Sequence, residues 1–252
     1  MVNASLSPEY GPVVAITVPQ ANTTVEPEMQ ALMSAGYSLL SARMTSPLQN
    51  SRARLVDYFD TLGQTLDQFD VAPVQAAGFA CTGSSYLVGR QEDQRRLAVL
   101  SAERGYPVLG TADAIARALQ NLGARRIALL SPYPAWLSKA GQDYWRECGL
   151  ELLCVASLPE DLLDTRNIYK LRTVRVQEIF DQLELGSCDA VVMSGTGMPT
   201  LRLMAQLSLP VPVLSSNLCL AWVLQCAVHA PKSESDVLAA LLDIEAPWRG
   251  SL

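Results

Sequence analysis

Histidine is nearly absent from this chain, which has 252 residues and a single histidine, His229. One imidazole is too few for a metal centre with several histidines, and it leaves little basis for a catalytic triad. Because His229 falls in a helix-like stretch, we expect a packed or surface residue there. The six cysteines form no CxxC pair typical of zinc sites or redox motifs. No GxGxxG or P-loop pattern is present either, so we expect neither a metal nor a cofactor.

An excess of basic charge is also lacking. The net charge is −6 and the isoelectric point is about 4.9, which argues against nucleic acid or an anionic membrane as a partner. A small anionic substrate stays compatible with this charge, because backbone dipoles can make a site locally positive.

Long apolar runs and a basic N-terminal start are missing as well. No run approaches the roughly 18 apolar residues that cross a bilayer, and the first ten residues show no secretory signal. We therefore expect a soluble, cytoplasmic protein whose cysteines are free thiols.

The patterns that are present predict an α/β fold. Apolar, β-branched runs alternate with segments whose apolar residues recur at helical spacing, which is typical of parallel βαβ units. Strands are expected at 13–19, 37–44, 76–80, 107–111, 126–133 and 150–157, and a strand followed by a turn at 190–198. Helices are expected from about residue 24 to 35 and at 54–69, 91–104, 111–122, 136–148 and 173–185.

Three features of the first half recur in the same order in the second. The strand at 13–19 is echoed at 126–132, and each of these segments ends in proline. The turn Cys81-Thr82-Gly83 is echoed by Gly195-Thr196-Gly197, and Pro107-Val108-Leu109 by Pro212-Val213-Leu214. We infer an internal duplication: two similar α/β halves with parallel sheets, related by a pseudo-twofold axis and separated by a cleft that holds the active site. Residues 1–122 and 212–252 are assigned to the first half, and residues 123–211 to the second.

One turn carries the candidate catalytic residue. An apolar strand ends at Cys81 and opens into small polar residues, Thr82-Gly83-Ser84-Ser85. A thiol at the start of a helix lies beside free backbone N–H groups, which lower its pKa and favour an anion. The alternative is that Cys81 is a buried, small apolar residue, the commonest fate of a free cysteine.

These motifs resemble the aspartate/glutamate racemase superfamily and, within it, the branch of maleate isomerases and arylmalonate decarboxylases. The resemblance extends over roughly residues 13–222. It is carried by five short segments in order: Pro19-Gln20-Ala21-Asn22-Thr23-Thr24-Val25-Glu26, Ala80-Cys81-Thr82-Gly83-Ser84, Ser131-Pro132-Tyr133, Thr165-Arg166-Asn167-Ile168 and Val192-Met193-Ser194-Gly195-Thr196-Gly197-Met198-Pro199.

The resemblance implies a small carboxylate or dicarboxylate substrate and a set of site residues. Cys81 is the implied catalytic group. The implied substrate-binding residues are Asn22, Thr82, Gly83, Tyr133, Asn167, Gly195, Thr196 and Gly197.

The chain departs from the family pattern at one position. Gly195 stands where maleate isomerases and racemases have a second cysteine, so a racemisation that uses two opposed thiols lacks one acid–base group. A cofactor-independent isomerase that acts through one thiol, similar to maleate cis–trans isomerase, is the first hypothesis.

Two alternatives stay open. The first is a lyase of the arylmalonate decarboxylase type, in which Cys81 protonates an enediolate, although known members resemble the reverse order of glycine and cysteine. The second is a non-catalytic carboxylate-binding relative. The apolar face of residues 237–244 is compatible with a homo-oligomer, and we expect the acidic residues Glu160, Asp161 and Asp164 to form a solvated loop.

Overall fold

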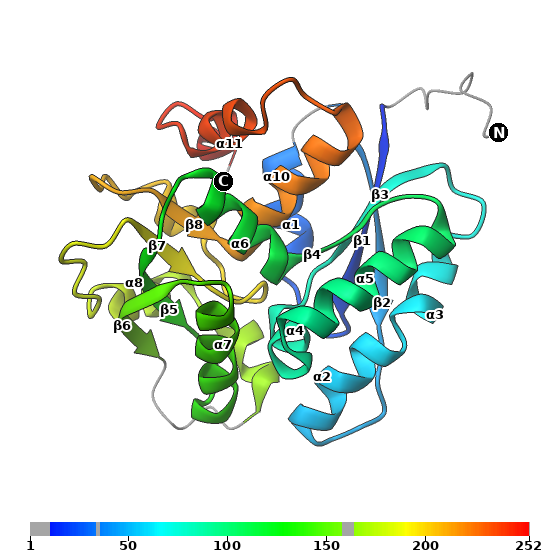
Figure 1. Ribbon diagram of the computed structural model, residues 1–252, viewed down its shortest axis with the longest axis horizontal. Coiled ribbons are helices and arrows are strands. Elements are labelled where there is room, and N and C mark those ends of the chain that lie inside the picture. Colours follow the sequence, from blue (N-terminus) through cyan, green and yellow to red (C-terminus); the bar gives the residue numbers. More distant parts are fainter. Residues whose placement is uncertain (1–10, 34–35, 158–163, 252) are drawn as a thin grey trace.

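Two parallel four-stranded sheets form the centre of the computed structural model, which describes residues 11–33, 36–157 and 164–251 (Figure 1). The first sheet has the order β2 (Ser38–Met44), β1 (Val13–Pro19), β3 (Val74–Phe79) and β4 (Val108–Gly110). The second has the order β6 (Glu151–Ser157), β5 (Arg126–Ser131), β7 (Ala190–Met193) and β8 (Val213–Ser215). The order of strands within each half is therefore the same, which confirms the predicted pair of similar α/β halves.

The central strands are apolar because helices cover both faces of each sheet. All seven residues of β1 and all four of β7 are buried, as expected for parallel strands without a solvent-facing side. Every pair of neighbouring strands in both sheets is parallel. Parallel pairing brings the carboxyl ends of β1 and β3 to one edge of the first sheet, and the carboxyl ends of β5 and β7 to one edge of the second.

Helices connect the strands. Those preceding β5 are α1 (Val25–Met33), α2 (Ser51–Asp60), α3 (Leu62–Leu66), α4 (Thr82–Val88), α5 (Arg90–Arg104) and α6 (Thr111–Asn121). Those following it are α7 (Ala135–Glu147), α8 (Thr173–Phe180), α9 (Leu201–Met204), α10 (Ser216–His229) and α11 (Glu234–Leu242). Short 3-10 helices lie at Asp67–Phe69, Thr165–Lys170 and Pro247–Gly250.

Two predicted helices are shorter than expected. The segment 54–69 is interrupted at Thr61, whose hydroxyl donates to Asp57 O at 2.7 Å and competes with the helical backbone. In the segment 173–185 the α-helix ends at Phe180. The residues after it form turns with hydrogen bonds from residue i to residue i−3, such as Leu183 N to Phe180 O. Leucines at 183 and 185 pack on the core beyond the helix end, so their helical spacing was misleading.

The chain crosses between the halves at α10. The preceding strand, β8, pairs with β7 in the second sheet, whereas α10 packs on α6, α1 and β3 of the first half. Figure 1 shows α10 beside α1. The division of the chain at residues 122/123 and 211/212 stays a prediction. That division assigns β8 to the first half, whereas in the structure β8 belongs to the second sheet. Within the three described ranges, no helix combines the length and the apolar character needed to cross a bilayer.

Candidate active site

Two turns meet where β3 and β7 end. Cys81 is the N-cap residue of α4, and the turn Gly195-Thr196-Gly197 follows β7. The Thr196 hydroxyl donates to Ala80 O at 2.9 Å, and it accepts a hydrogen bond from Asn22 Nδ2 at 3.3 Å. The two turns thus face each other directly, at the edge where open α/β sheets bind ligands.

A small cavity lies between these turns, with a volume of about 20 Å³. That volume holds about one water molecule, so a dicarboxylate enters only if the site opens. Residues of both halves line it: Pro19, Arg54, Leu55, Tyr58, Cys81, Gly83, Tyr133, Thr165, Ile168, Tyr169, Thr196 and Gly197. The cavity therefore combines one thiol, one guanidinium and three phenols.

The Cys81 thiol is almost completely buried, with 5% of the residue exposed. Its Sγ lies 3.2 Å from Ser84 Oγ, and Ser84 in turn donates to Leu55 O at 2.6 Å. Because the Leu55 carbonyl can only accept, the Ser84 proton points to it, and the Ser84 oxygen accepts a hydrogen bond from the neutral thiol of Cys81.

Burial raises the pKa of Cys81. This effect outweighs the lowering by the backbone N–H groups of Ser84 and Gly83, and by the Ser84 hydroxyl when it donates to the thiolate instead of to Leu55 O. The sequence had led us to expect a lowered pKa. The helix start does favour the thiolate, but in this enclosed site desolvation is the larger effect.

Tyr133 joins the second half to the Cys81 turn. Its hydroxyl lies 2.5 Å from Thr82 Oγ1, and only 7% of the residue is exposed. Burial, and then the nearby charge of Cys81, raise the pKa of Tyr133, so the phenol stays neutral. A second phenol, Tyr86, bridges the halves through Ser194 at 2.6 Å.

Arg54 was missed by the sequence analysis because it lies in an amphipathic helix. Its side chain is 2% exposed and is 2.8 Å from the carboxylate of Asp164. Asp164 also accepts from Arg166 at 2.6 Å, and these partners hold its pKa below the usual range although burial opposes them. The expected solvated loop is thus wrong for Asp164, whereas Glu160 and Asp161 lie outside the described residues. Two guanidinium groups and one carboxylate leave a net positive charge beside the cavity.

The two asparagines implied by the resemblance are used differently. Asn22 caps the start of α1, because its Oδ1 accepts from Thr24 N at 2.9 Å, and its amide reaches Thr196. The Asn167 side chain accepts from Lys170 at 3.1 Å and is not among the residues that line the cavity. The neighbouring Ile168 and Tyr169 line it instead.

Gly195 has a backbone conformation that a cysteine would rarely adopt, with φ of +104°. A Cβ at this position would lie 2.7 Å from Pro132 Cγ and 3.4 Å from the Tyr133 hydroxyl. The Gly195 N–H donates to Ser216 Oγ at 2.8 Å. Glycine at position 195 therefore suits both the backbone conformation and the close packing of this turn.

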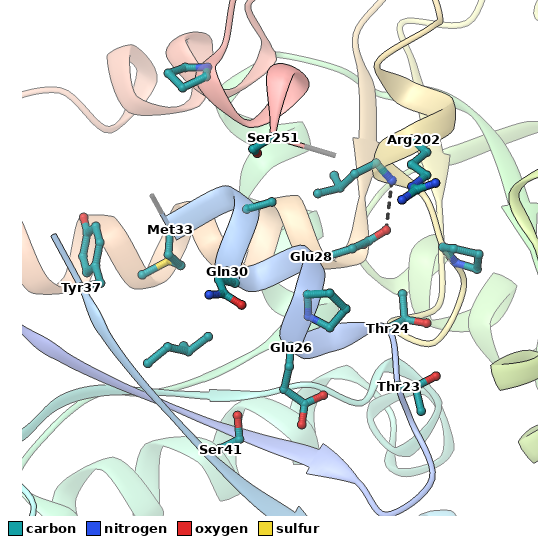
Figure 2. Close-up of a pocket in the computed structure, with 16 residues that line it drawn as sticks. Thr23, Thr24, Glu26, Glu28, Gln30, Met33, Tyr37, Ser41, Arg202 and Ser251 are labelled. Atoms are coloured by element: carbon teal, nitrogen blue, oxygen red, sulfur yellow. Dashed lines mark hydrogen bonds between the residues drawn. The ribbon is translucent and has the colours of Figure 1, made fainter. Parts of the chain in front are cut away.

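A larger groove lies elsewhere, along α1. It has a volume of about 1190 Å³, and Figure 2 shows Glu28 and Arg202 among its lining residues. It shares no lining residue with the Cys81 cavity. Glu28 is buried and accepts hydrogen bonds from Thr200 N, Leu201 N and Asn217 Nδ2 at 2.6 to 3.0 Å. It fixes α1 to α9 and α10 and, through Asn217, to the Thr196 turn. In the described parts of the chain, no three His, Cys, Asp or Glu side chains converge as metal ligands would.

Comparison with known proteins agrees with this geometry. A sequence profile of the arylmalonate decarboxylase family matches residues 14–238. The chain belongs to this family. Among characterised relatives, it is 28% identical over 216 residues to a maleate isomerase of Geobacillus stearothermophilus, covering 79% of this chain and 85% of that one. A maleate isomerase of Pseudomonas putida is 26% identical over 188 residues, covering 70% and 74%.

Solved structures share the fold of this family member. One is a maleate cis–trans isomerase of Nocardia farcinica, a cysteine-to-serine mutant with a covalently bound succinylcysteine intermediate. Its TM-score is 0.77 at 23% identity, with 86% of this chain and 92% of that chain covered. An arylmalonate decarboxylase gives a TM-score of 0.70 at 17% identity, with 88% and 95% covered.

Proposed function

We propose that this protein is a cofactor-independent cis–trans isomerase of a small unsaturated dicarboxylate, with Cys81 as its nucleophile. One observation carries the proposal: a single buried thiol faces a cavity whose other polar side chains are phenols, threonine hydroxyls and a guanidinium. The maleate isomerases among its relatives support the choice of substrate class.

The reaction begins with the Cys81 thiolate. Its sulfur adds to one carbon of the C=C bond, and the π electrons move to the other carbon and its carboxylate, forming an enediolate. The former double bond is now single and can rotate. Re-formation of C=C then expels the thiolate and leaves the trans product.

The surrounding groups suit the charges of this reaction. The net positive charge of Arg54, Asp164 and Arg166 attracts a dianion. The Tyr133 and Thr82 hydroxyls can donate to an enediolate oxygen in a site without bulk water, where such bonds are strongest. Asn22 supports this arrangement by holding Thr196.

The test uses maleate and proton NMR. The protein at high concentration should convert maleate to fumarate, and Cys81→Ser should lower the rate at least roughly a thousandfold, since a serine hydroxyl without a base is a poor nucleophile. Cys154→Ser is the matched control, because Cys154 is another free thiol but lies on β6 and bonds to Glu184 O, outside the cavity. No fumarate at high protein concentration would exclude maleate as a substrate.

The second candidate is a decarboxylase, which the family match itself favours. There the enediolate forms by loss of CO2 from a malonate-type substrate, and Cys81 protonates it. Incubation with an arylmalonate in D2O separates the two functions, because only the decarboxylase would release CO2 and leave one deuteron in the product. A Cys81 that resists alkylation and is indifferent to dicarboxylates would favour a binding protein without catalysis.

A further inference from the structure

The position of the second thiol is crowded by Pro132 and adjoins a hydroxyl. A Cβ at residue 195 would overlap Pro132 Cγ at 2.7 Å, and its next neighbours are Pro132 Cδ and the Tyr133 hydroxyl, both at 3.4 Å. Tyr133 thus lies beside the place from which a second thiol would extend.

Tyr133 and Cys81 approach the same cavity from different halves. Cys81 begins α4 of the first half, and Tyr133 follows β5 of the second. The Tyr133 hydroxyl reaches across to Thr82, the residue directly after Cys81. A ligand between the two turns would therefore have sulfur on one side and a phenol on the other.

The other two phenols of the cavity have different surroundings. The Tyr169 ring, rather than its hydroxyl, covers Gly197, since its Cδ1 and Cε1 atoms lie 2.6 Å from a Cβ built there. Tyr58 projects from α2, next to Arg54 and Leu55, and is not among the nearest neighbours of position 195. Tyr133 is the phenol whose hydroxyl adjoins the missing thiol.

We propose that Tyr133 is the second acid–base group of the site and exchanges a proton with the substrate carbon that Cys81 does not attack. This role rests on the proposed isomerase function. It explains how a chain without the second thiol can still protonate and deprotonate carbon.

The proton transfers balance without a co-reactant. The thiolate forms a C–S bond, and the enediolate carbon takes the Tyr133 proton, so a saturated adduct and a tyrosinate result. The Thr82 hydroxyl can donate to the tyrosinate. After rotation, the tyrosinate removes a proton from the same carbon, C=C re-forms, and the C–S bond breaks to regenerate thiolate and phenol. Burial raises the pKa of both groups, but an ordinary thiol ionises before an ordinary phenol, which matches these starting states.

The first measurement compares Tyr133→Phe with Tyr58→Phe, which removes a hydroxyl from the same cavity. For maleate isomerisation, we expect Tyr133→Phe to lower kcat by about 10²- to 10⁴-fold, the usual contribution of general acid–base catalysis, with KM changed less than about threefold. Tyr58→Phe should lower kcat much less. Incorporation of a fluorinated tyrosine at position 133 should restore most of the lost rate.

The second measurement does not depend on isomerase activity. Iodoacetamide alkylates a thiolate by displacement, whereas N-ethylmaleimide forms an adduct whose carbon must be protonated. In Tyr133→Phe, Cys81 should react with iodoacetamide at the wild-type rate, which also shows that the site is folded. In D2O the wild-type maleimide adduct should carry its deuteron on one face, and the Tyr133→Phe adduct on both.

These outcomes separate the two claims. Failure of the wild-type protein to make fumarate would overturn the isomerase and leave the stereochemistry of the maleimide adduct to decide the role of Tyr133. Equal kcat values for Tyr133→Phe and Tyr58→Phe, or a one-faced deuteron in Tyr133→Phe, would overturn the acid–base role. If Tyr133→Phe does not fold, Thr82→Val removes the partner of the phenol and should lower kcat by about tenfold; an unchanged kcat would also count against the role.

Discussion

Replacement of Gly195 by alanine tests why the second thiol cannot simply be restored. The added methyl group meets two obstacles, a backbone φ of +104° and Pro132 Cγ at 2.7 Å. Strain in the left-handed region costs about 1–2 kcal/mol, and overpacking of a tight site costs about 1–3 kcal/mol. Gly195→Ala should therefore lower the free energy of unfolding by about 2–5 kcal/mol.

Two other glycines separate these obstacles. Gly149 has a φ of +78° but open space around a Cβ, so Gly149→Ala should cost only the strain, about 1–2 kcal/mol. Gly250 has open space and no positive φ, and Gly250→Ala should be within about 0.5 kcal/mol of wild type.

Urea denaturation of the three variants is the assay, with equal m-values as the condition for comparing their free energies. The difference between Gly195→Ala and Gly149→Ala isolates the contact with Pro132. If the two variants were equally stable, Pro132 would yield without cost and our explanation for glycine at 195 would fail. If Gly195→Ala is instead the less stable variant, Gly195→Cys combined with Pro132→Ala is a direct route to a two-thiol site.

Two further predictions concern buried titratable groups. The alkylation rate of Cys81 by iodoacetamide should rise about tenfold per pH unit from pH 7 to 9, because burial raises the pKa of the thiol. Mass spectrometry of the Cys81 peptide measures this rate, and a rate that is already constant above about pH 7 would contradict the prediction. Burial raises the pKa of Asp93 to about 6, and its carboxylate accepts a hydrogen bond from Tyr144 at 2.9 Å. In the unfolded chain the Asp93 carboxyl loses its proton near pH 4, whereas in the folded protein it keeps the proton up to about pH 6. The free energy of unfolding therefore falls by up to roughly 3 kcal/mol as the pH rises from 4 through about 6. Asp93→Asn should flatten the fall of Tm between pH 4.5 and 7, and an unchanged slope would show that Asp93 does not cause it.

The sequence predicted the fold well because its signals are local. The buried run at β1 can be recognised from its β-branched residues, and its echo at β5 from an apolar run that a proline follows. The bounds of α10 were not predicted, because this helix is apolar on nearly every side and gives no amphipathic period. It is buried between elements that lie far from it in the sequence.

The site was predicted unevenly for a similar reason. Cys81 and Thr196 lie on turns that the repeat itself marks. Arg54 is part of a helix with ordinary apolar spacing, and its partner Asp164 is 110 residues away, so no local pattern connects them. The identity of Gly195 was visible, but the approach of Pro132 that excludes a side chain there depends on the packing of two strands.

The buried carboxylate of Glu28 has a consequence for how the protein unfolds. Duplicated halves are often treated as independent folding units, yet this carboxylate joins α1 to α9 and α10. In addition, α10 completes the core of the half opposite to its preceding strand. The first half therefore has a complete core only after the chain has returned to it from the second half. Heat should unfold the chain in one cooperative transition, for which the calorimetric and van't Hoff enthalpies agree.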